Sequence, residues 1–374
     1  MLGVGIIGCG NISTAYLRLA PLFKGLEMRA VADLNPDAAR ARATEFGVRA
    51  ETVEGLLGAD DIDIVVNLTV PAAHFEVTRT ILEAGKHAYA EKPLVLSLEE
   101  GETLRTLAAA RGLRVGSAPD TFLGAAHQAA RATLDSGRIG KVVTGTAHVM
   151  SHGMEDWHPN PDFFFLPGAG PMLDLGPYYI TNLIQLLGPV ARVSALTSMG
   201  QETRTIGSEA RRGEVIPVKT PTTLHALLDF ASGASITLST SWDVWAHRHG
   251  HMELYGREGS MFLPDPNWFS GLVEVTIRDS APETLDVGDH PFAVPNDDMG
   301  GTPMANYRMA GLADMAAAMA EGRPHRCSLD LALHAVDVMT SILRAGEARE
   351  VVELSTTCER PAPLDADAAR ALLK

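Results

Sequence analysis

A glycine-rich turn near the start of the chain constrains its fold more than any other feature. The apolar run of residues 4–7 predicts a buried strand, and a helical pattern of apolar residues begins at Ile12. The turn between them contains Gly8 and Gly10, because so tight a reversal needs backbone angles open mainly to glycine. A missing Cβ also lets a pyrophosphate approach the amides at a helix N-terminus. The sequence therefore predicts dinucleotide binding at Gly8, Gly10, Asn11 and Ile12.

Two further positions bear on which dinucleotide is bound. Ser13 stands at the third position of the glycine fingerprint, where a small residue still allows close helix packing. Asp33 ends a second apolar run, residues 28–32, near the ~20-residue offset typical of the acid that binds the adenosine ribose. A carboxylate there accepts from the ribose 2′-hydroxyl and repels a 2′-phosphate, so we expect NAD, with NADP less favoured. The alternative is an ordinary turn, with Asp33 capping the helix that begins at Pro36.

The composition describes a globular protein with neutral or weakly charged substrates. A chain of 374 residues exceeds the size at which single cores stop growing, so two domains are expected. Hydrophobic residues make up 46% of the chain and charged residues 21%, which is typical of folded domains. The net charge of −15 argues against a nucleic-acid or anionic-membrane surface.

The sequence also predicts the cellular location of the protein and the state of its cysteines. No apolar run reaches the length of a membrane span, and the N-terminus enters a strand without a basic region or a cleavage site. We therefore expect a cytoplasmic location. Cys9, Cys327 and Cys358 are scattered and odd in number, so neither a disulfide framework nor a thiolate metal site is expected.

Strands and helices alternate through residues 1–122, which predicts a doubly wound parallel sheet with helices on both faces. In such sheets, ligands bind beyond the carboxyl ends of the strands. Polar residues and prolines do follow the predicted strands directly. These candidates are Thr69, Pro71 and His74, then Glu91, Lys92 and Pro93, then Asp120.

Residues 123–374 predict a second, α+β domain with a large, open, mostly antiparallel sheet. Strand-like runs at residues 224–230, 235–242 and 249–255 are separated by short turns. A helix is expected over residues 171–187 and others over 305–321 and 329–345, with long loops at 201–220 and 279–301. The uncovered sheet face predicts a homodimer or homotetramer, because an exposed apolar face favours burial against another subunit.

The triplet Glu91-Lys92-Pro93 is the most informative candidate for chemistry. A lysine directly after a buried strand is costly to desolvate, which argues for a function at the sheet edge, facing the nicotinamide. The alternative is a lysine that extends from a strand end into water. The apolar side of the helix over residues 305–320, with its methionines, is expected to be core.

Taken together, these motifs resemble the glucose-fructose oxidoreductase / inositol dehydrogenase (Gfo/Idh/MocA) family of NAD(P)-dependent sugar oxidoreductases. The resemblance covers nearly the whole chain and includes residues 84–94 and 170–178. It implies a Rossmann nucleotide-binding domain, an α/β domain with a large open sheet, and a site between them in which lysine assists proton transfer. The family also places an Asp and a His four residues apart on the second-domain helix. Here Asp174 matches, but Tyr178 stands at the histidine position.

The mechanism expected from this resemblance is hydride transfer between a secondary alcohol and the nicotinamide of NAD. Lys92 would exchange the hydroxyl proton. Asp174 and Tyr178 are the other two predicted catalytic residues, and they would share one helix face, as residues at i and i+4 do. Free histidine titrates near ~6.5 whereas tyrosine titrates near ~10, so the substitution changes the available proton chemistry.

Aromatic and polar residues of the second domain suggest a substrate wall. Sugars present apolar CH faces and many hydroxyls, which suits tryptophan beside histidine and aspartate. The predicted substrate-binding residues are Lys92, Asp120, His152, Trp157, His158, Asp174, Tyr178 and Asp243. The alternative is that Trp157 and Trp245 pack a domain or subunit interface. No metal is expected, because the histidine spacings match no usual ligand pattern.

Three functions therefore stay open. The first is an NAD-dependent dehydrogenase or reductase acting on a sugar, an inositol or a sugar derivative. The second is a glycosidase that oxidises transiently, eliminates and then reduces, with no net redox change. The third is a dinucleotide-sensing regulator without activity, against which the intact Lys92 and Asp174 argue.

Overall fold

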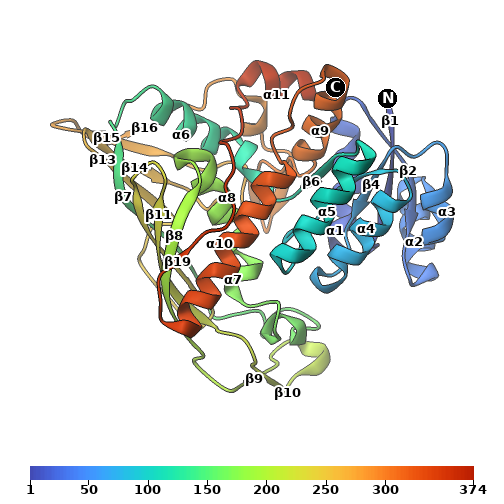
Figure 1. Cartoon of the computed structure of the whole chain (residues 1–374), viewed down its shortest axis with the longest axis horizontal. Helices are drawn as coiled ribbons and strands as arrows, with labels where there is room; N and C mark the ends of the chain where they lie inside the picture. The colour runs from blue at the N-terminus through green and yellow to red at the C-terminus, as the bar shows by residue number, and fades with distance from the viewer. The chain divides into compact units, whose positions relative to one another are not determined.

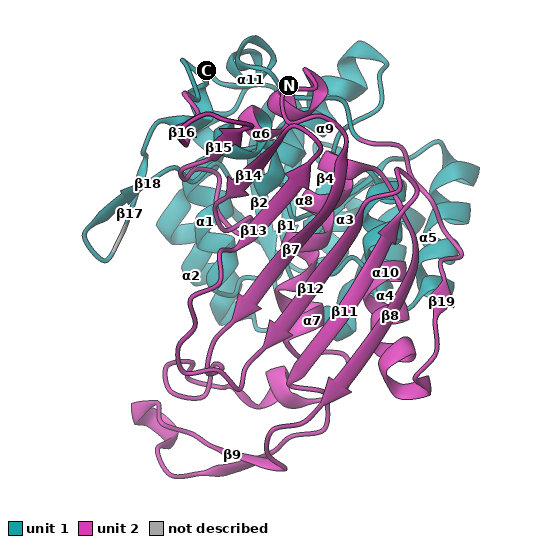
Figure 2. Ribbon diagram, turned by 90° about the vertical axis from the view of Figure 1, so that its left-hand side faces the viewer, with its two compact units in different colours: residues 1–128, 287–336, 361–374 teal, residues 129–286, 337–360 magenta. Residues whose placement is uncertain are grey.

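The computed structural model of the protein describes residues 1–298 and 300–374. It divides into two compact units, which we describe separately (Figure 2). Unit 1 comprises residues 1–128, 287–336 and 361–374, and unit 2 comprises residues 129–286 and 337–360. The predicted division into residues 1–122 and 123–374 differs from these units mainly in the late segments that group with the N-terminal part, and it stays a prediction.

Unit 1 is built on a parallel sheet with the strand order β3-β2-β1-β4-β5-β6. Its strands are β1 Leu2–Ile7, β2 Leu26–Ala32, β3 Arg49–Glu51, β4 Ile64–Asn67, β5 His87–Ala90 and β6 Val115–Ser117. The crossover helices are α1 Asn11–Leu19, α2 Pro36–Phe46, α3 Val53–Gly58, α4 His74–Glu83 and α5 Leu98–Arg111 (Figure 1). Every strand pair is parallel, which confirms the predicted doubly wound sheet.

Local sequence signals explain where these helices begin and end. Ser97 caps α5 by accepting from the amide of Glu100, whose side chain returns the bond. Gly112 ends the same helix in the left-handed region at φ 63°. Asn35 caps α2, with Pro36 at the first helical position. The strand order reverses between β1 and β4, which places the glycine turn at the switch point where ligands bind in such sheets.

Later segments of the chain complete unit 1. Helix α9, Ala310–Glu321, lies against β6, where the sulfur of Met315 comes within 3.1 Å of the position a Cβ on Gly116 would take. Helix α11, Ala366–Leu372, packs on α9. Met309 and Met315 are fully buried, as expected for core residues, whereas Met319 is only partly buried. Helix α9 begins later than predicted because Met309 has a φ of 93°.

The predicted loop over residues 279–301 contains two short strands, β16, Glu283–Thr284, and β17, Asp297–Met299. Strand β17 pairs with β18, Thr302–Met304.

Unit 2 is dominated by a mixed sheet with the order β16-β15-β14-β13-β7-β12-β11-β8-β19 (Figure 2). Its longer strands are β7 Val142–Met150, β8 Val190–Ser198, β11 Thr223–Phe230, β12 Ser235–Ser241, β13 Met252–Gly256, β14 Gly259–Leu263 and β15 Glu274–Ile277, and β19 is Val352–Glu353. Most pairs are antiparallel, as predicted, but β7 and β12 run parallel. Along β11, Leu224 and Leu228 are buried while Leu227 is 53% exposed, so one face of this strand is core and the other faces solvent.

Helices α6, Ala125–Asp135, and α10, Leu329–Ala348, each run from unit 1 into unit 2. The helix predicted over residues 171–187 is interrupted. It forms α7, Pro171–Asp174, and α8, Gly176–Leu187. The interruption lies beside Pro177, which has no amide to donate to the preceding turn. The amide of Tyr178 consequently donates to the carbonyl of Leu175 at 3.2 Å, a tighter turn than in an α-helix.

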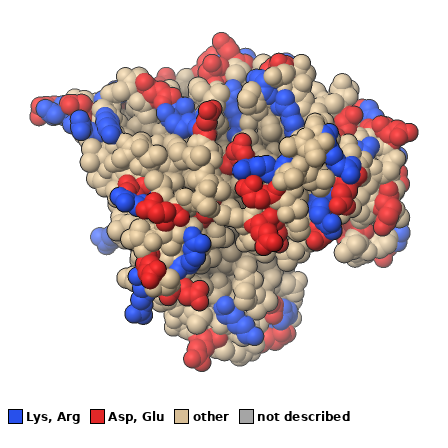
Figure 3. Space-filling model, in the orientation of Figure 1, with Lys and Arg blue, Asp and Glu red and all other residues tan. Residues whose placement is uncertain are grey.

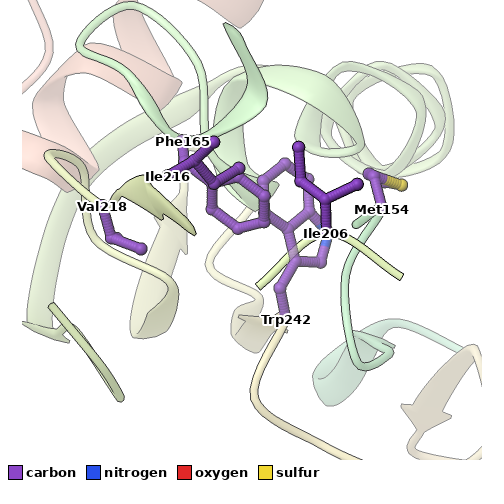
Figure 4. Close-up of a cluster of buried hydrophobic side chains, with 6 residues drawn as sticks. All are labelled: Met154, Phe165, Ile206, Ile216, Val218 and Trp242. Atoms are coloured by element: carbon purple, nitrogen blue, oxygen red, sulfur yellow. The ribbon is translucent and has the colours of Figure 1, made fainter. Parts of the chain in front are cut away.

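The prediction of a long loop over residues 201–220 is wrong. Strands β9, Thr203–Thr205, and β10, Val215–Pro217, form a hairpin. The hairpin is held by a buried apolar cluster that gathers around the indole of Trp242 (Figure 4). The cluster consists of Met154, Phe165, Ile206, Ile216, Val218 and Trp242. Strands this short show almost no periodicity in sequence, and their burial depends on residues far along the chain.

The surface chemistry agrees with the composition. On the face drawn in Figure 3, acidic and basic side chains are interspersed. Among the described residues, no helix combines the length and apolar character that crossing a membrane requires.

Candidate active site

The two glycines of the turn are required for different reasons. Gly8 has a φ of 105°, and a Cβ there would lie 2.6 Å from the carbonyl carbon of Leu68. The fold itself therefore demands glycine at this position. Gly10 precedes α1 with an ordinary φ of −72°, and the space around its missing Cβ is open to at least 4 Å. Glycine at position 10 thus leaves room for a ligand to approach the amides at the start of α1.

The side chain of Ser13 stabilises the glycine turn by a hydrogen bond to its backbone. Its side chain is fully buried, and its Oγ donates to the carbonyl of Gly10 at 2.6 Å while accepting from Nε of Arg42 at 3.2 Å. The hydroxyl therefore supports the turn that Gly10 shapes, in place of the third glycine of the fingerprint.

Asp33 lies at the end of β2, beside the turn. Its carboxylate accepts from the amide of Cys9 at 2.7 Å and from the amide of Asn35 at 2.8 Å. Each oxygen keeps a second lone pair for a ribose hydroxyl. A hollow of about 520 Å³ borders Asp33, and its walls include Glu51 and Glu54 as well as Arg40. The wall therefore carries charges of both signs.

The loops after β4 and β5 are tied together by His74. Its imidazole is 1% exposed, with Nδ1 2.6 Å from the carbonyl of Pro93 and Nε2 3.0 Å from the carbonyl of Thr69. Burial lowers the pKa of His74, while the contacts with the carbonyls of Pro93 and Thr69 oppose the fall, because both carbonyls can accept together only from a protonated ring. Asn67 adds a second tie, because its Oδ1 accepts from the hydroxyl of Thr69 at 2.7 Å. Pro71 begins the short helical turn that leads from Thr69 into α4.

Glu91 connects the first helix to the lysine that follows it. Oε1 of Glu91 accepts from the hydroxyl of Tyr16 on α1 at 3.1 Å, and Oε2 accepts from the amide of Lys92 at 3.1 Å. Tyr16 is 1% exposed. Burial and, next, the charge of Glu91 raise the pKa of Tyr16 well above its usual value, so the hydroxyl is a permanent donor. Helix α1, which follows the glycine turn, and the Glu91-Lys92-Pro93 loop are therefore joined by a part-buried hydrogen bond within unit 1.

We expect the variant Tyr16→Phe to loosen this loop. Removing the donor leaves a carboxylate oxygen short of a partner, which should lower the free energy of unfolding by about 1–3 kcal/mol. NAD-dependent turnover should fall with it. Tyr307→Phe is the matched control, because it removes a bond to the carbonyl of Val294 at 3.0 Å, away from this loop. Equal losses of turnover in the two variants would show that Tyr16 acts only on stability; denaturant unfolding and steady-state rates measure both.

Asp120 caps helix α9 from inside unit 1. The carboxylate is 3% exposed, and its Oδ2 accepts from the amides of Met309 at 2.9 Å and Gly311 at 3.0 Å. Burial raises the pKa of Asp120 to about 6, while the bond from Gly311 and the charge of Arg308 oppose the rise. The structure thus gives Asp120 a structural contact, and its predicted contact with substrate stays a prediction.

This carboxylate should make stability depend on pH. Between pH ~4 and ~6 the unfolded chain loses the Asp120 proton while the folded protein keeps it, so the free energy of unfolding falls as pH rises, by about 3 kcal/mol. The variant Asp120→Asn, which retains an accepting oxygen, should remove this part of the slope. Urea unfolding at pH 4.5, 5.5 and 6.5 measures it. Identical slopes in both proteins would contradict the assignment.

In unit 2, the predicted residues lie on three segments. Asp174 ends α7 and Tyr178 lies in the first turn of α8, and both side chains are half-buried. His152, Trp157 and His158 belong to the loop after β7. Trp157 is 64% exposed and meets the ring of His158 edge-on, with centroids 5.5 Å apart.

Asp243 is held in a network around a buried arginine. Its carboxylate accepts from Arg204 and from the hydroxyls of Thr222 at 2.7 Å and Thr223 at 2.6 Å. Arg204 also donates to Glu155 at 2.8 Å. The structure therefore shows Asp243 engaged inside unit 2, and its role in binding substrate stays a prediction.

Several residues that matter for the candidate site were missed by the sequence reasoning. The helical spacing that begins at Ile12 puts Tyr16 on the inner face of its helix and indicates no polar role for it, and Asn67, Glu155 and Arg204 carry no signal of their own. A buried polar residue at the end of an apolar strand, as Asn67 is, could have indicated a loop tie. Among the described residues, no group of three or more His, Cys, Asp or Glu is placed to hold a metal ion.

Two family models match the chain. Residues 2–118 match the model described as an oxidoreductase family with an NAD-binding Rossmann fold, and residues 127–262 match the GFO/IDH/MocA C-terminal domain. The chain belongs to the Gfo/Idh/MocA oxidoreductase family. Its N-terminal part is therefore an NAD-binding Rossmann domain, as the glycine turn and Asp33 predicted.

Curated relatives within this group carry sugar-related names. A dTDP-3,4-didehydro-2,6-dideoxy-alpha-D-glucose 3-reductase from Streptomyces violaceoruber is 33% identical over 198 residues, 51% of this chain and 56% of that protein. Levoglucosan dehydrogenase from Pseudarthrobacter phenanthrenivorans is 26% identical over 294 residues, 70% of this chain and 73% of that protein. The chain spans about half the length of the first curated relatives it matches.

Solved structures show the same fold at low identity. A levoglucosan dehydrogenase in complex with NADH and L-sorbose superposes with a TM-score of 0.81 at 22% identity, covering 95% of this chain and 99% of that chain. At 22% identity this similarity shows the fold of the chain alone and does not identify its substrate.

Proposed function

We propose that the protein is an NAD-dependent oxidoreductase that transfers hydride between the nicotinamide and a secondary alcohol or ketone of a sugar, an inositol or a sugar derivative. The observation that carries the proposal is the Glu91-Lys92-Pro93 loop. It follows β5 at the carboxyl edge of the sheet and is fixed by Tyr16 and His74. These bonds hold the backbone from which the side chain of Lys92 projects.

The residues fit the dinucleotide that the family implies. Gly8, Gly10, Asn11 and Ile12 would receive the pyrophosphate, and Asp33 the adenosine ribose, while Thr69, Pro71 and His74 would shape the nicotinamide end. When bound, NAD supplies the hydride acceptor or donor.

Within this scheme, the chain moves one proton. Lys92 would exchange the proton of the substrate hydroxyl, and Asp174 and Tyr178 would assist in binding and orienting the substrate. Tyr178 offers a phenolic hydroxyl at the position where the family resemblance predicts a histidine.

A substrate screen tests the proposal directly. Purified protein with NAD, and separately with NADP, is supplied with inositols, aldoses and sugar acids while NADH fluorescence is followed. Reduction of NAD by at least one secondary alcohol is expected. Cleavage of a chromogenic glycoside without net NADH would instead support the glycosidase. Tight NAD binding with neither activity would support a sensing regulator.

We also propose a homodimer or homotetramer formed through the solvent-facing side of the unit 2 sheet. Leu196, Leu227 and Val351 are 65%, 53% and 63% exposed there and border a hollow of about 420 Å³. Light scattering of the purified protein tests this, because a monomer at micromolar concentration would contradict it. A cytoplasmic location also stays a prediction.

A further inference from the structure

The loops after β7 and β12 lie side by side because these two strands pair in parallel. Met150, the last residue of β7, is in register with Ser241, the last residue of β12. The first loop carries His152 and the second carries Trp245, and their rings stack with centroids 3.4 Å apart and planes 22° apart. Trp245 is 79% exposed, so much of its indole stays open while the stack fixes the plane of the imidazole.

Arg204 contacts both the backbone of His152 and the carboxylate of Glu155, which lies beside the His152 ring. Arg204, which is 3% exposed on β9, donates from one nitrogen to the backbone carbonyl of His152 at 3.1 Å and to Oε1 of Glu155 at 2.8 Å. The same Oε1 lies 3.6 Å from Nδ1 of His152. The guanidinium therefore fixes the backbone of His152 directly and holds the carboxylate of Glu155 beside its ring.

The carboxylates beside the ring select its tautomer. Nδ1 of His152 faces Glu155 at 3.6 Å and Oδ2 of Asp156 at 3.8 Å. Two negative acceptors on one side favour the tautomer with hydrogen on Nδ1, which leaves the lone pair on Nε2. Nδ1 itself is buried without a hydrogen-bond partner, so the two carboxylates act on it through their charge and not through a hydrogen bond. No residue among those described makes a hydrogen bond to Nε2, and the side chain keeps 24% of its surface exposed. Nε2 is consequently an oriented acceptor for a hydroxyl donor.

Burying the Arg204–Glu155 ion pair beside this ring carries a large desolvation free energy. The side chains of Arg204 and Glu155 are 2% and 3% exposed. If stability were their only role, two apolar residues of similar volume would stabilise the hairpin as well as this buried ion pair does. Met154, from the same loop, is anchored in the cluster around Trp242 (Figure 4). The loop after β7 is thus held by the hydrogen bonds of Arg204 and by the apolar packing of Met154. A residue that recognises a ligand needs such a rigid backbone.

We propose that His152 is a specificity-determining residue that accepts a hydrogen bond from a substrate hydroxyl, with Trp245 offering an apolar platform and with Glu155 and Arg204 as positioning residues. The inference rests on the proposed function and narrows it to neutral polyhydroxylated substrates. An anionic group at this position would meet Glu155 and Asp156, while the positive charge of Arg204 is already paired with Glu155 and Asp243.

The test measures binding separately from turnover. Calorimetry with the NAD complex of the full chain uses neutral probes (myo-inositol, glucose and further cyclitols and pyranoses) and anionic probes (gluconate, glucose 6-phosphate). Neutral probes should bind, and His152→Asn should weaken them about tenfold, the value of one hydrogen bond. In turnover assays KM should rise with little change in kcat. His225→Asn, an exposed histidine on β11, is the matched control and should bind as the wild type does.

The outcomes are distinguishable from those of the proposed function. Unchanged binding in His152→Asn, preference for the anionic probes, or binding of no neutral probe each overturns the inference, even if NADH forms. Neutral probes that bind through His152 without any NADH formation would support the inference and overturn the proposed oxidoreductase.

The positioning role has its own spectroscopic signature. In the ¹⁵N spectrum of the imidazoles, His152 should report hydrogen on Nδ1 in the wild type. Glu155→Ala should shift the ring toward the other tautomer, and Glu155→Gln, which keeps an accepting oxygen, should restore it. If Glu155→Ala does not fold, Glu155→Gln and His152→Asn still decide the result. An unchanged tautomer in a folded Glu155→Ala variant would overturn the role of Glu155.

Discussion

Replacing Lys92 by methionine should leave NAD binding intact and reduce turnover by roughly 10²–10⁴, the range that general acid/base catalysis contributes. Methionine is close to lysine in length, so it keeps the packing of the half-buried stem but carries no exchangeable proton. The loop should hold its shape, because the backbone amide of residue 92 donates to Glu91 in the variant as in the wild type. Steady-state rates and NAD titrations by fluorescence measure the two effects.

Two further variants separate proton exchange from charge. Lys92→Arg keeps a cation that stays protonated in proteins, so its turnover should remain low. Lys86→Met removes a lysine just before the opposite end of β5, where Nζ donates to the carbonyl of Ala59 at 2.7 Å, and its turnover should stay normal. Near-normal rates in Lys92→Met would remove this lysine from catalysis.

Replacing Gly8 by alanine should cost about 3 kcal/mol of unfolding free energy, from the strained φ and the clash together. The new Cβ would lie 2.6 Å from both the carbonyl carbon and the oxygen of Leu68, which are backbone atoms of the adjoining strand end and have little room to move. A loss of this size corresponds to a fall in melting temperature of roughly 6–12 °C. NAD affinity should fall as well, because the displaced turn no longer presents its amides.

Gly10→Ala is the matched control for this prediction. Its φ of −72° suits alanine and nothing lies within 4 Å of the added Cβ, so the melting temperature should stay close to that of the wild type. NAD affinity should nevertheless fall, because the methyl group would occupy the approach of the pyrophosphate. Full NAD affinity in Gly10→Ala would show that the dinucleotide does not cross this turn. Calorimetric melting with and without NAD measures both variants.

Local signals explain how much of the fold could be predicted. Hydrophobic periodicity and the glycine turn predicted the parallel sheet of unit 1, and short turns predicted the mostly antiparallel sheet of unit 2. The same reasoning failed over residues 201–220, because strands of three residues leave no period to detect. It also joined α7 to α8, although Pro177 was visible in the sequence.

The sequence by itself determined the glycine turn before α1, the position of Asp33 at the end of β2 and that of the lysine after β5, because each depends on residues close to it in the chain. Only the tertiary structure decided what supports them. Tyr16 reaches Glu91 across 75 residues of sequence, and Arg204 reaches Glu155 across 49. Such bonds form between side chains that become neighbours only when strands pair and helices pack, so no local pattern of residues records them.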